Sequence, residues 1–198
     1  LTFSKRLIAT SPSGAEKRTV ELASIFTGST DSAMDLGTAV HAIFEEIVDI
    51  NDVDCKAVAE HWLDEADFPQ DMKDTAVKMF LPCVENADVR TALTRPTSQS
   101  EVWIEKGFEV VIDNEWITGF FDRVTLVRDA DGQLNGAVIL DYKTDRINSS
   151  ADVDAAIETY SPQLELYQKV LSRLTGLEPS RIRKQLLLVR PGQIVEVI

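Results

Sequence analysis

The chain has 198 residues and a formal net charge of −13 at pH 7, and its length suits one domain with a sizeable core. So large an acidic excess argues against general adhesion to nucleic acid, because phosphate contacts require local lysine and arginine. A local basic surface stays compatible with it, and basic residues gather late in the chain: Arg173, Arg181, Arg183, Lys184 and Arg190. A solvated helix end and turn would explain this group equally well.

The two cysteines, Cys55 and Cys83, are far apart, and neither lies in a C-x-x-C pair or beside a histidine at metal spacing. The sequence therefore predicts reduced thiols, with no disulfide framework, zinc site or iron–sulfur cluster. No apolar stretch approaches the roughly 20 residues that span a bilayer, and residues 1–17 show no signal core or targeting pattern. Because the first residue is Leu1, we expect a piece of a longer chain. Because residues 1–17 show no signal core or targeting pattern, we expect it to act in the cytoplasm.

The chain divides into a lead-in and one domain. Residues 1–34 are expected to be a lead-in or linker, and residues 35–198 the domain. Its helical part is predicted over about 35–93 and its sheet-containing core over about 99–198. The order of helices, an antiparallel run of strands, a helical crossover and a closing strand or pair predicts an α/β or α+β fold. In this fold a central mixed sheet is flanked by helices.

The helical part begins with an amphipathic segment over 37–50, where apolar residues fall on one stripe. His41 and Glu45 are four residues apart and lie together on the flank of that stripe. They are therefore expected to border the core without belonging to it. Two further helices are predicted over 55–66 and 70–86.

Beyond the helices, the period changes to the alternation of strands. Residues 101–112 are predicted to form a hairpin that turns near Lys106-Gly107, and a second turn at Asp113-Asn114 is predicted to lead into a third strand over 116–127. Asp122 lies in that third strand, and alternation places it on one face with apolar neighbours. An aspartate is seldom buried without a partner, so Asp122 is a candidate functional residue.

The stretch Gly136–Asp145 is an apolar run typical of a strand buried on both faces, and it ends in Asp-Tyr-Lys. Side chains alternate along a strand, so Asp141 and Lys143 are expected on one face and Tyr142 on the other. An unpaired ion at the edge of a core costs on the order of several kcal/mol. A metal, a counter-charge or a phosphate is therefore expected nearby.

A further helix is predicted to begin at Ser161 and Pro162, which suit a cap and a first turn. A short helical stretch precedes it. Gln163 and Tyr167 are four residues apart on the stripe that this helix turns towards the sheet. The chain is predicted to close with two strands, 182–189 and 194–198.

Together these groups suggest a chemistry. The carboxylates of Asp122 and Asp141 and the imidazole of His41 can hold a hard divalent cation such as Mg²⁺. Lys143, two residues after one ligand and on its face, can orient or deprotonate an attacking water while the metal stabilises the charge on a pentavalent phosphorus. Such a combination hydrolyses phosphodiesters.

Each group alone has a plainer interpretation. An isolated Asp-x-Lys is more often an exposed charge pair where a strand ends, and a histidine on a helix flank is more often a hydrogen-bonded core residue. A glutamine and a tyrosine four residues apart can simply pack. Their joint presence with Asp122 favours the site. Glu45 and Glu101 are further candidates for the metal shell, although a solvated carboxylate is the plainer interpretation of both.

These residues lie in four motifs that resemble those of RecB-type nucleases in the PD-(D/E)XK superfamily, and most closely the C-terminal nuclease domain of AddA-like helicase–nucleases. The motifs are Gly37-Thr-Ala-Val-His41, Gly119-Phe-Phe-Asp122-Arg-Val124, Ile139-Leu-Asp141-Tyr-Lys143-Thr-Asp145 and Tyr160-Ser-Pro-Gln163-Leu-Glu-Leu-Tyr167. They cover about residue 35 to the end of the chain, in the family's order. Phe121 is a departure, because proline is usual before the aspartate.

The resemblance implies three kinds of role. The metal ligands would be His41, Asp122, Asp141 and the main-chain carbonyl of Tyr142. The catalytic residues would be Asp122, Asp141 and Lys143. The supporting residues, which would also contact the DNA backbone, would be Gln163 and Tyr167.

The resemblance further implies a Mg²⁺-dependent deoxyribonuclease, in which Mn²⁺ can substitute, acting as an exonuclease on linear DNA. Such a module serves a helicase–nuclease in double-strand-break end processing and recombinational repair, with a motor in the same full-length chain and a second helicase–nuclease subunit as partners. The chain lacks the cysteines of the iron–sulfur branch and a G-x-x-x-x-G-K-[ST] loop, so neither a cluster nor an ATP site is expected here. The alternative is a catalytically silent module with a structural or DNA-binding part in a helicase complex.

Overall fold

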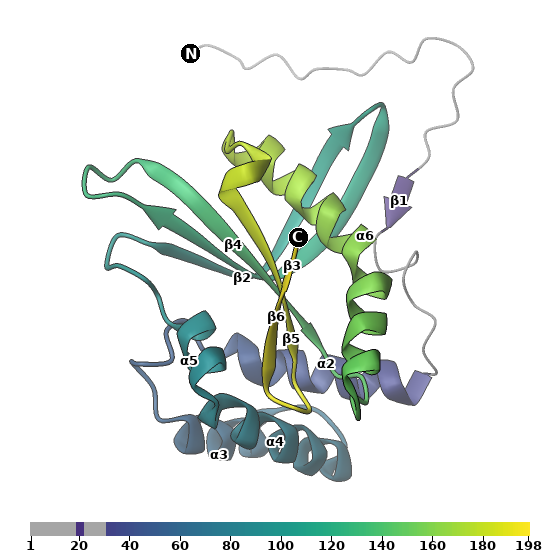
Figure 1. Ribbon diagram of the computed structural model, residues 1–198. Coiled ribbons are helices and arrows are strands. Elements are labelled where there is room, and N and C mark those ends of the chain that lie inside the picture. The colour runs from purple at the N-terminus through teal and green to yellow at the C-terminus, as the bar shows by residue number, and fades with distance from the viewer. Residues whose placement is uncertain (1–18, 22–30) are drawn as a thin grey trace, which may run out of the picture.

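A mixed six-stranded sheet forms the centre of the protein, with a layer of helices on each face (Figure 1). The computed structural model describes residues 19–21 and 31–198. Its elements are β1 (Thr19–Glu21), α2 (Asp31–Glu45), α3 (Cys55–Glu65), α4 (Gln70–Glu85), α5 (Ala87–Leu93), β2 (Glu101–Ile112), β3 (Glu115–Arg128), β4 (Leu134–Lys143), α6 (Ser150–Thr175), the 3-10 turn η1 (Pro179–Arg181), β5 (Ile182–Leu188) and β6 (Gln193–Val197). The predicted α+β class and mixed sheet are confirmed. In that part of the chain, no helix has the length and apolar character needed to cross a membrane.

The long strand β3 organises the sheet. The antiparallel partner β2 lies along one side of it, while β1 and β4 pair with its first and second parts. β5 is parallel to β4, as expected of two strands joined through the helical crossover α6, and β6 closes the sheet antiparallel to β5. The strand β1 lies among the residues that we expected to be a lead-in.

The predicted turn at Lys106-Gly107 is wrong, because β2 continues through both residues. The other predicted turn, at Asp113 and Asn114, is confirmed and joins β2 to β3, and its φ angles of 50° and 66° suit the two-residue turn that matches strand twist. Gly107 has a packing reason, since a Cβ there would lie 3.1 Å from Cε1 of Phe120 on the paired strand. The glycine therefore makes room for a ring.

Two helix boundaries also differ from prediction. α2 ends at Glu45 and not at residue 50. α6 is one helix of 26 residues that runs through Pro162, and its cap is Ser149, which forms a capping box with Asp152. Ser161 lies inside the helix and donates its hydroxyl to the Ile157 carbonyl. The capping box at Ser149, twelve residues upstream of the expected cap Ser161, defines where α6 begins.

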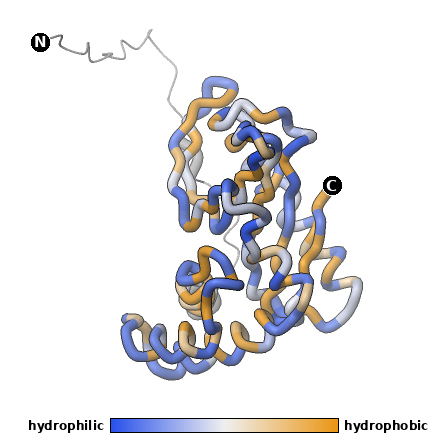
Figure 2. The backbone as a smooth tube through the Cα atoms, turned by 90° about the vertical axis from the view of Figure 1, so that its left-hand side faces the viewer, coloured by the Kyte–Doolittle hydropathy of each residue, from blue (hydrophilic) through white to orange (hydrophobic). Residues whose placement is uncertain are grey.

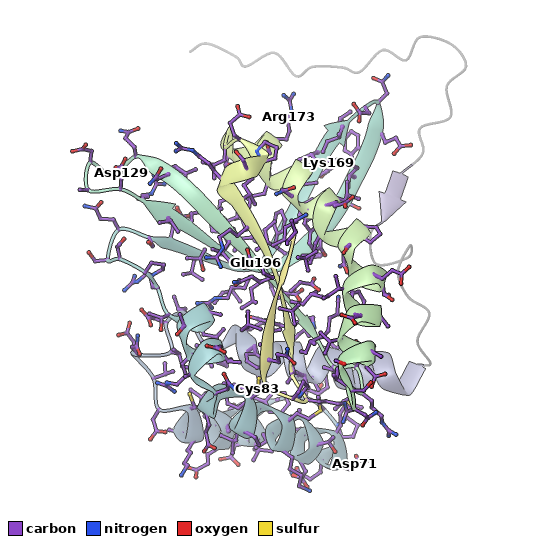
Figure 3. All side chains as sticks on the ribbon, in the orientation of Figure 1. Asp71, Cys83, Asp129, Lys169, Arg173 and Glu196 are labelled. Carbon is purple, nitrogen blue, oxygen red and sulfur yellow. The ribbon has the colours of Figure 1, made fainter. Side chains whose placement is uncertain are left out.

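Two apolar clusters occupy the two faces of the sheet, and neighbouring strand residues divide between them. Ile139 belongs to the cluster beneath α6 and Leu140 to the cluster beneath α2 to α5. Figure 2 shows hydrophobic and hydrophilic positions interspersed along the helices. Cys83, on the helical side, is buried and free, and Cys55 is free and half-buried (Figure 3), so the expected reduced thiols are present.

Arg123 ties the sheet to the helical layer. Its side chain is fully buried and donates to the carbonyls of Ile47 and Val48, both at 2.7 Å, just beyond the end of α2. It also donates to the Leu93 carbonyl at 2.9 Å, at the end of α5. Carbonyls at helix C-termini lack helical partners and carry partial negative charge, so they compensate the buried cation.

Candidate active site

The candidate site forms where β3 and β4 separate. Their ladder ends with the pair Arg123 and Leu140, although β4 stays paired with β5 through Lys143. The next residues in register would be Asp122 and Asp141. In place of a backbone partner, the Tyr142 amide donates to Oδ2 of Asp122 at 2.7 Å. Two carboxylates therefore lie at the opening of the sheet.

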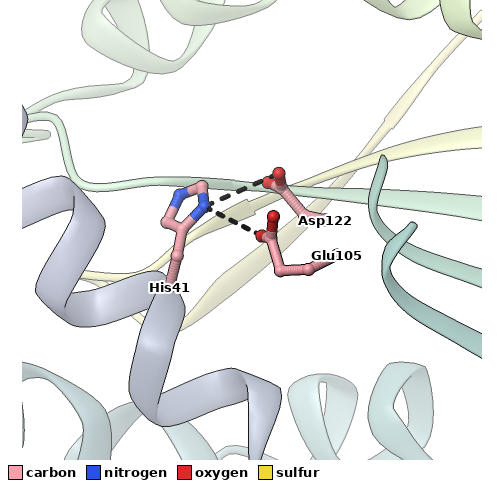
Figure 4. Close-up of side chains that lie close together, drawn as sticks. All are labelled: His41, Glu105 and Asp122. Carbon is pink, nitrogen blue, oxygen red and sulfur yellow. Dashed lines mark ion pairs between the residues drawn. The ribbon is translucent and has the colours of Figure 1, made fainter. Parts of the chain in front are cut away.

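His41 reaches this opening from α2. Its Nε2 lies 3.0 Å from the Tyr142 carbonyl oxygen, and its Nδ1 lies 3.6 Å from Oδ1 of Asp122 and 3.8 Å from Oε1 of Glu105 (Figure 4). The Tyr142 ring packs edge-on against the imidazole, on the helical side of the sheet. The structure thus brings together His41, Asp122 and the Tyr142 carbonyl, three of the predicted ligand groups.

Asp141 and Lys143 lie on the other face from the Tyr142 side chain, as strand alternation predicted. Oδ2 of Asp141 is buried and forms an ion pair with Nζ of Lys143 at 2.7 Å. Nζ donates to Oε1 of Gln163 at 3.2 Å. Nε2 of Gln163 in turn donates to the Tyr167 hydroxyl at 3.0 Å. Of the predicted supporting pair, Gln163 therefore contacts the lysine directly and Tyr167 contacts Gln163.

Glu105 is a member of the site that sequence reasoning missed. Its φ of 42° interrupts the extended backbone of β2 and turns the carboxylate towards His41. The two-residue turn at Asp113 and Asn114 could have revealed it. A two-residue turn there pairs Ile112 with Glu115, and in an antiparallel hairpin every further pair has the same sum of residue numbers, 227. That register places Glu105 opposite Asp122.

The two glutamates named from the sequence lie differently. Glu101 contacts Arg128 at 3.6 Å and accepts a hydrogen bond from Trp103 at 2.7 Å. Glu45 is exposed, and partial burial together with Glu105 and other carboxylates raises its pKa. Glu45 is therefore near the rim of the site. Glu101, the first residue of β2, is instead engaged with Arg128 at the end of β3.

The site carries an excess of negative charge. Burial lowers the pKa of His41, but the Asp122 and Glu105 carboxylates outweigh burial and raise it to about 9. Burial raises the pKa of Asp141 to about 6, although Lys143 opposes this shift. Burial lowers the pKa of Lys143, and the carboxylates of Asp141 and Asp122 outweigh it, so that the net shift is upward. All three pKa values are raised, so each group binds a proton more readily than usual, and the site as a whole favours additional positive charge.

This donor set fits a divalent cation. His41, Glu105 and Asp122 each offer one ligand atom, and these atoms lie within 4.8 Å of one another. Asp141 lies outside that group and supplies a buried carboxylate, of which Oδ2 faces the Lys143 ammonium. Carboxylate and carbonyl oxygens suit Mg²⁺ and Mn²⁺, and imidazole can complete the set.

The basic residues late in the chain do not form one free surface. Arg183 pairs with Glu196 at 2.8 Å, and Arg181 donates to the Asn135 side chain. Arg190 donates to the Thr144 carbonyl, and Lys184 is buried. These contacts favour the structural interpretation of the group over a phosphate-binding groove.

Comparison with known families gives a match over most of the chain. The family model described as the PD-(D/E)XK nuclease superfamily matches residues 17–196. No curated protein matches the chain.

Proposed function

The chain belongs to the PD-(D/E)XK nuclease superfamily, and from this premise we propose that it is a metal-dependent deoxyribonuclease that hydrolyses phosphodiester bonds. One observation carries the proposal. Where β3 and β4 separate, the chain gathers two aspartates, a glutamate, a histidine and a lysine. Structural carboxylates rarely gather in this way without a cation to compensate them.

The proposed metal ligands are His41, Asp122, Asp141 and the Tyr142 carbonyl, and Glu105 is added by its position. A bound Mg²⁺ or Mn²⁺ would supply Lewis-acid stabilisation of the charge that develops on the phosphoryl oxygens. His41 must lose its proton to act as a ligand, so binding should release protons.

Lys143 would act next to the scissile phosphate. Its ammonium is held by Asp141 and Gln163, and its raised pKa keeps it charged at neutral pH. A charged lysine donates hydrogen bonds, so we assign it to orienting the attacking water and the phosphoryl oxygens. Deprotonation of the water then requires another base, for which bulk water or a substrate phosphate oxygen is available.

A narrower proposal rests on the four motifs. We place the domain with the RecB-type, AddA-like nucleases, as an exonuclease module acting in the cytoplasm on linear DNA ends. In this proposal a helicase motor in the same full-length chain and a second helicase–nuclease subunit deliver the DNA during double-strand-break processing and recombinational repair. The net charge of −13 supports delivery by partner domains, because the domain itself offers little attraction for phosphates.

The test compares the cleavage of end-labelled linear DNA with that of closed circular DNA that is labelled internally. Both substrates are used in single- and double-stranded form, with Mg²⁺, Mn²⁺ or a chelator. Asp141→Asn and Lys143→Ala should each lower the rate by at least about 100-fold, the scale of losing a main electrostatic contributor. Asp71→Asn is the matched control, because Asp71 is an exposed carboxylate in the first turn of α4 (Figure 3) and is no member of the site. Equal rates in all four proteins would identify a contaminant.

The exonuclease assignment predicts that linear DNA is cleaved and closed circles are not. Absence of cleavage by the wild type, even with a helicase motor and its partner subunit present, would support the alternative. The domain would then be a silent nuclease-fold module that serves as a structural or DNA-binding part.

A further inference from the structure

The aromatic ring of Tyr160 lies against the lysine of the candidate site. Nζ of Lys143 is 4.4 Å from the centroid of that ring, within the range of a cation–π contact. The Lys143 side chain is 15% exposed, and loss of water strengthens such a contact. The ammonium therefore has an uncharged partner besides Asp141 and Gln163.

Asp145 fixes the orientation of the ring. The Tyr160 hydroxyl donates to Oδ2 of Asp145 at 2.9 Å, and Asp145 lies two residues beyond Lys143. Burial, and then Asp145, raise the pKa of Tyr160 to about 12, so the hydroxyl remains a neutral donor. One side chain of α6 thus holds both the lysine and the segment that follows β4.

This arrangement has a consequence for the ion pair of Asp141 with Lys143. A carboxylate that binds a cation attracts a neighbouring ammonium less, because its charge is shared. The Tyr160 ring is neutral and is no metal ligand, so its attraction for the ammonium is independent of the state of Asp141. Gln163, one helical turn further along α6, contributes a second neutral contact.

We propose that Tyr160, held by Asp145, is a positioning residue that keeps the Lys143 ammonium in the site when Asp141 engages a metal. This inference rests on the proposed nuclease function. The positioning role of Tyr160 also differs from a simple packing role. Tyr160 does contact the apolar cluster beneath α6, but a packing role would be satisfied by any apolar side chain of similar size.

The first test uses NMR and needs no cleavage. In the wild type, the ε-methylene protons of Lys143 should be displaced upfield by the ring current of Tyr160, both without metal and with saturating Mg²⁺. Tyr160→Phe should keep this displacement, and Tyr160→Leu should abolish it. Resonances that return to ordinary lysine values on addition of Mg²⁺ would overturn the proposal, whether or not the protein cleaves DNA.

The second test separates kcat from KM. Tyr160→Leu should lower kcat about tenfold and change KM by less than about twofold, as expected for a group that acts on the chemical step. Tyr160→Phe should retain kcat within about threefold, and so should Asp145→Asn, which keeps the ring and an oxygen acceptor for the hydroxyl. Tyr160→Met provides a second variant without a ring if the leucine variant does not fold.

The two hypotheses fail differently. If the wild type cleaves DNA and Tyr160→Leu cleaves equally fast, the positioning role is wrong and the nuclease function stands. If phenylalanine and leucine cause equal losses, the hydroxyl alone matters and the cation–π contact is refuted. If the wild type never cleaves DNA, the nuclease function fails, and the NMR comparison with Mg²⁺ still decides whether the ring holds the lysine.

Discussion

Replacing Arg123 with methionine should strongly destabilise the domain while leaving its volume nearly unchanged. The guanidinium makes three hydrogen bonds of 2.7 to 2.9 Å to the carbonyls of Ile47, Val48 and Leu93. The Leu93 carbonyl also accepts a hydrogen bond from the Ile50 amide at 3.3 Å, so the carbonyls of Ile47 and Val48 are the two that lose their donor. Leaving a buried acceptor unsatisfied costs about 1–3 kcal/mol, so two acceptors set a loss of roughly 2–6 kcal/mol. Relief of the desolvation of the buried cation offsets part of this. We therefore expect a net loss of about 2–4 kcal/mol, within a total stability of roughly 5–15 kcal/mol.

Urea denaturation followed by far-UV circular dichroism measures this loss as a lower midpoint at constant m value. Tyr142→Phe is the control for losing one buried polar atom beside Arg123, because the Tyr142 hydroxyl lies near the guanidinium but makes no hydrogen bond of ordinary geometry among the described residues. That variant should change stability by less than about 1 kcal/mol. A loss below about 1 kcal/mol for Arg123→Met would refute the reasoning, since the helix-end carbonyls would then find other donors.

Three further predictions concern other parts of the molecule. In metal-free protein, NMR should give His41 a pKa near 9. Its stabilising contribution is complete below about pH 6.5 and is lost as pH rises through about 9, while Mg²⁺ should shift its titration to lower pH by competing with the proton. With a thiol reagent at pH 8, Cys55 should react first and Cys83 only on unfolding, because burial raises the pKa of Cys83 to about 12. Gly192→Ala should cost about 1–3 kcal/mol by thermal unfolding, because its φ is 63° and a Cβ would lie 3.3 Å from the Cys83 backbone. Gly107→Ala should cost less than about 1 kcal/mol, since it meets only an exposed, movable ring.

The sequence predicted those features of the site that depend on neighbours along the chain. Strand alternation correctly placed Asp141 and Lys143 on one face, and the helical period placed Gln163 and Tyr167 on the inner stripe of α6. The fold class followed from the order of helical and alternating segments. Whether these side chains act on DNA stays a prediction.

Features that depend on distant contacts escaped prediction. Glu105 required the register of one long hairpin, which the additional turn predicted at Lys106-Gly107 divided in two. The partners of Arg123 lie at least 30 residues away, at helix ends that no local pattern connects to β3. α6 was divided in two because a proline suggested a start, whereas the upstream capping box and the packing of the whole helix outweigh one missing backbone donor.

The backbone irregularity at Glu105 also bears on solubility. Within the described part of the chain, β2 pairs with β3 alone, so its twelve residues present an open edge to other molecules. Such an edge invites pairing with a second chain, and a local kink is one way to prevent it. With φ at 42°, Glu105 divides the edge into two shorter segments. A β-branched residue there would favour straight backbone, so Glu105→Val is expected to self-associate, and Glu105→Asn, which tolerates the left-handed region, is the better choice for removing the carboxylate.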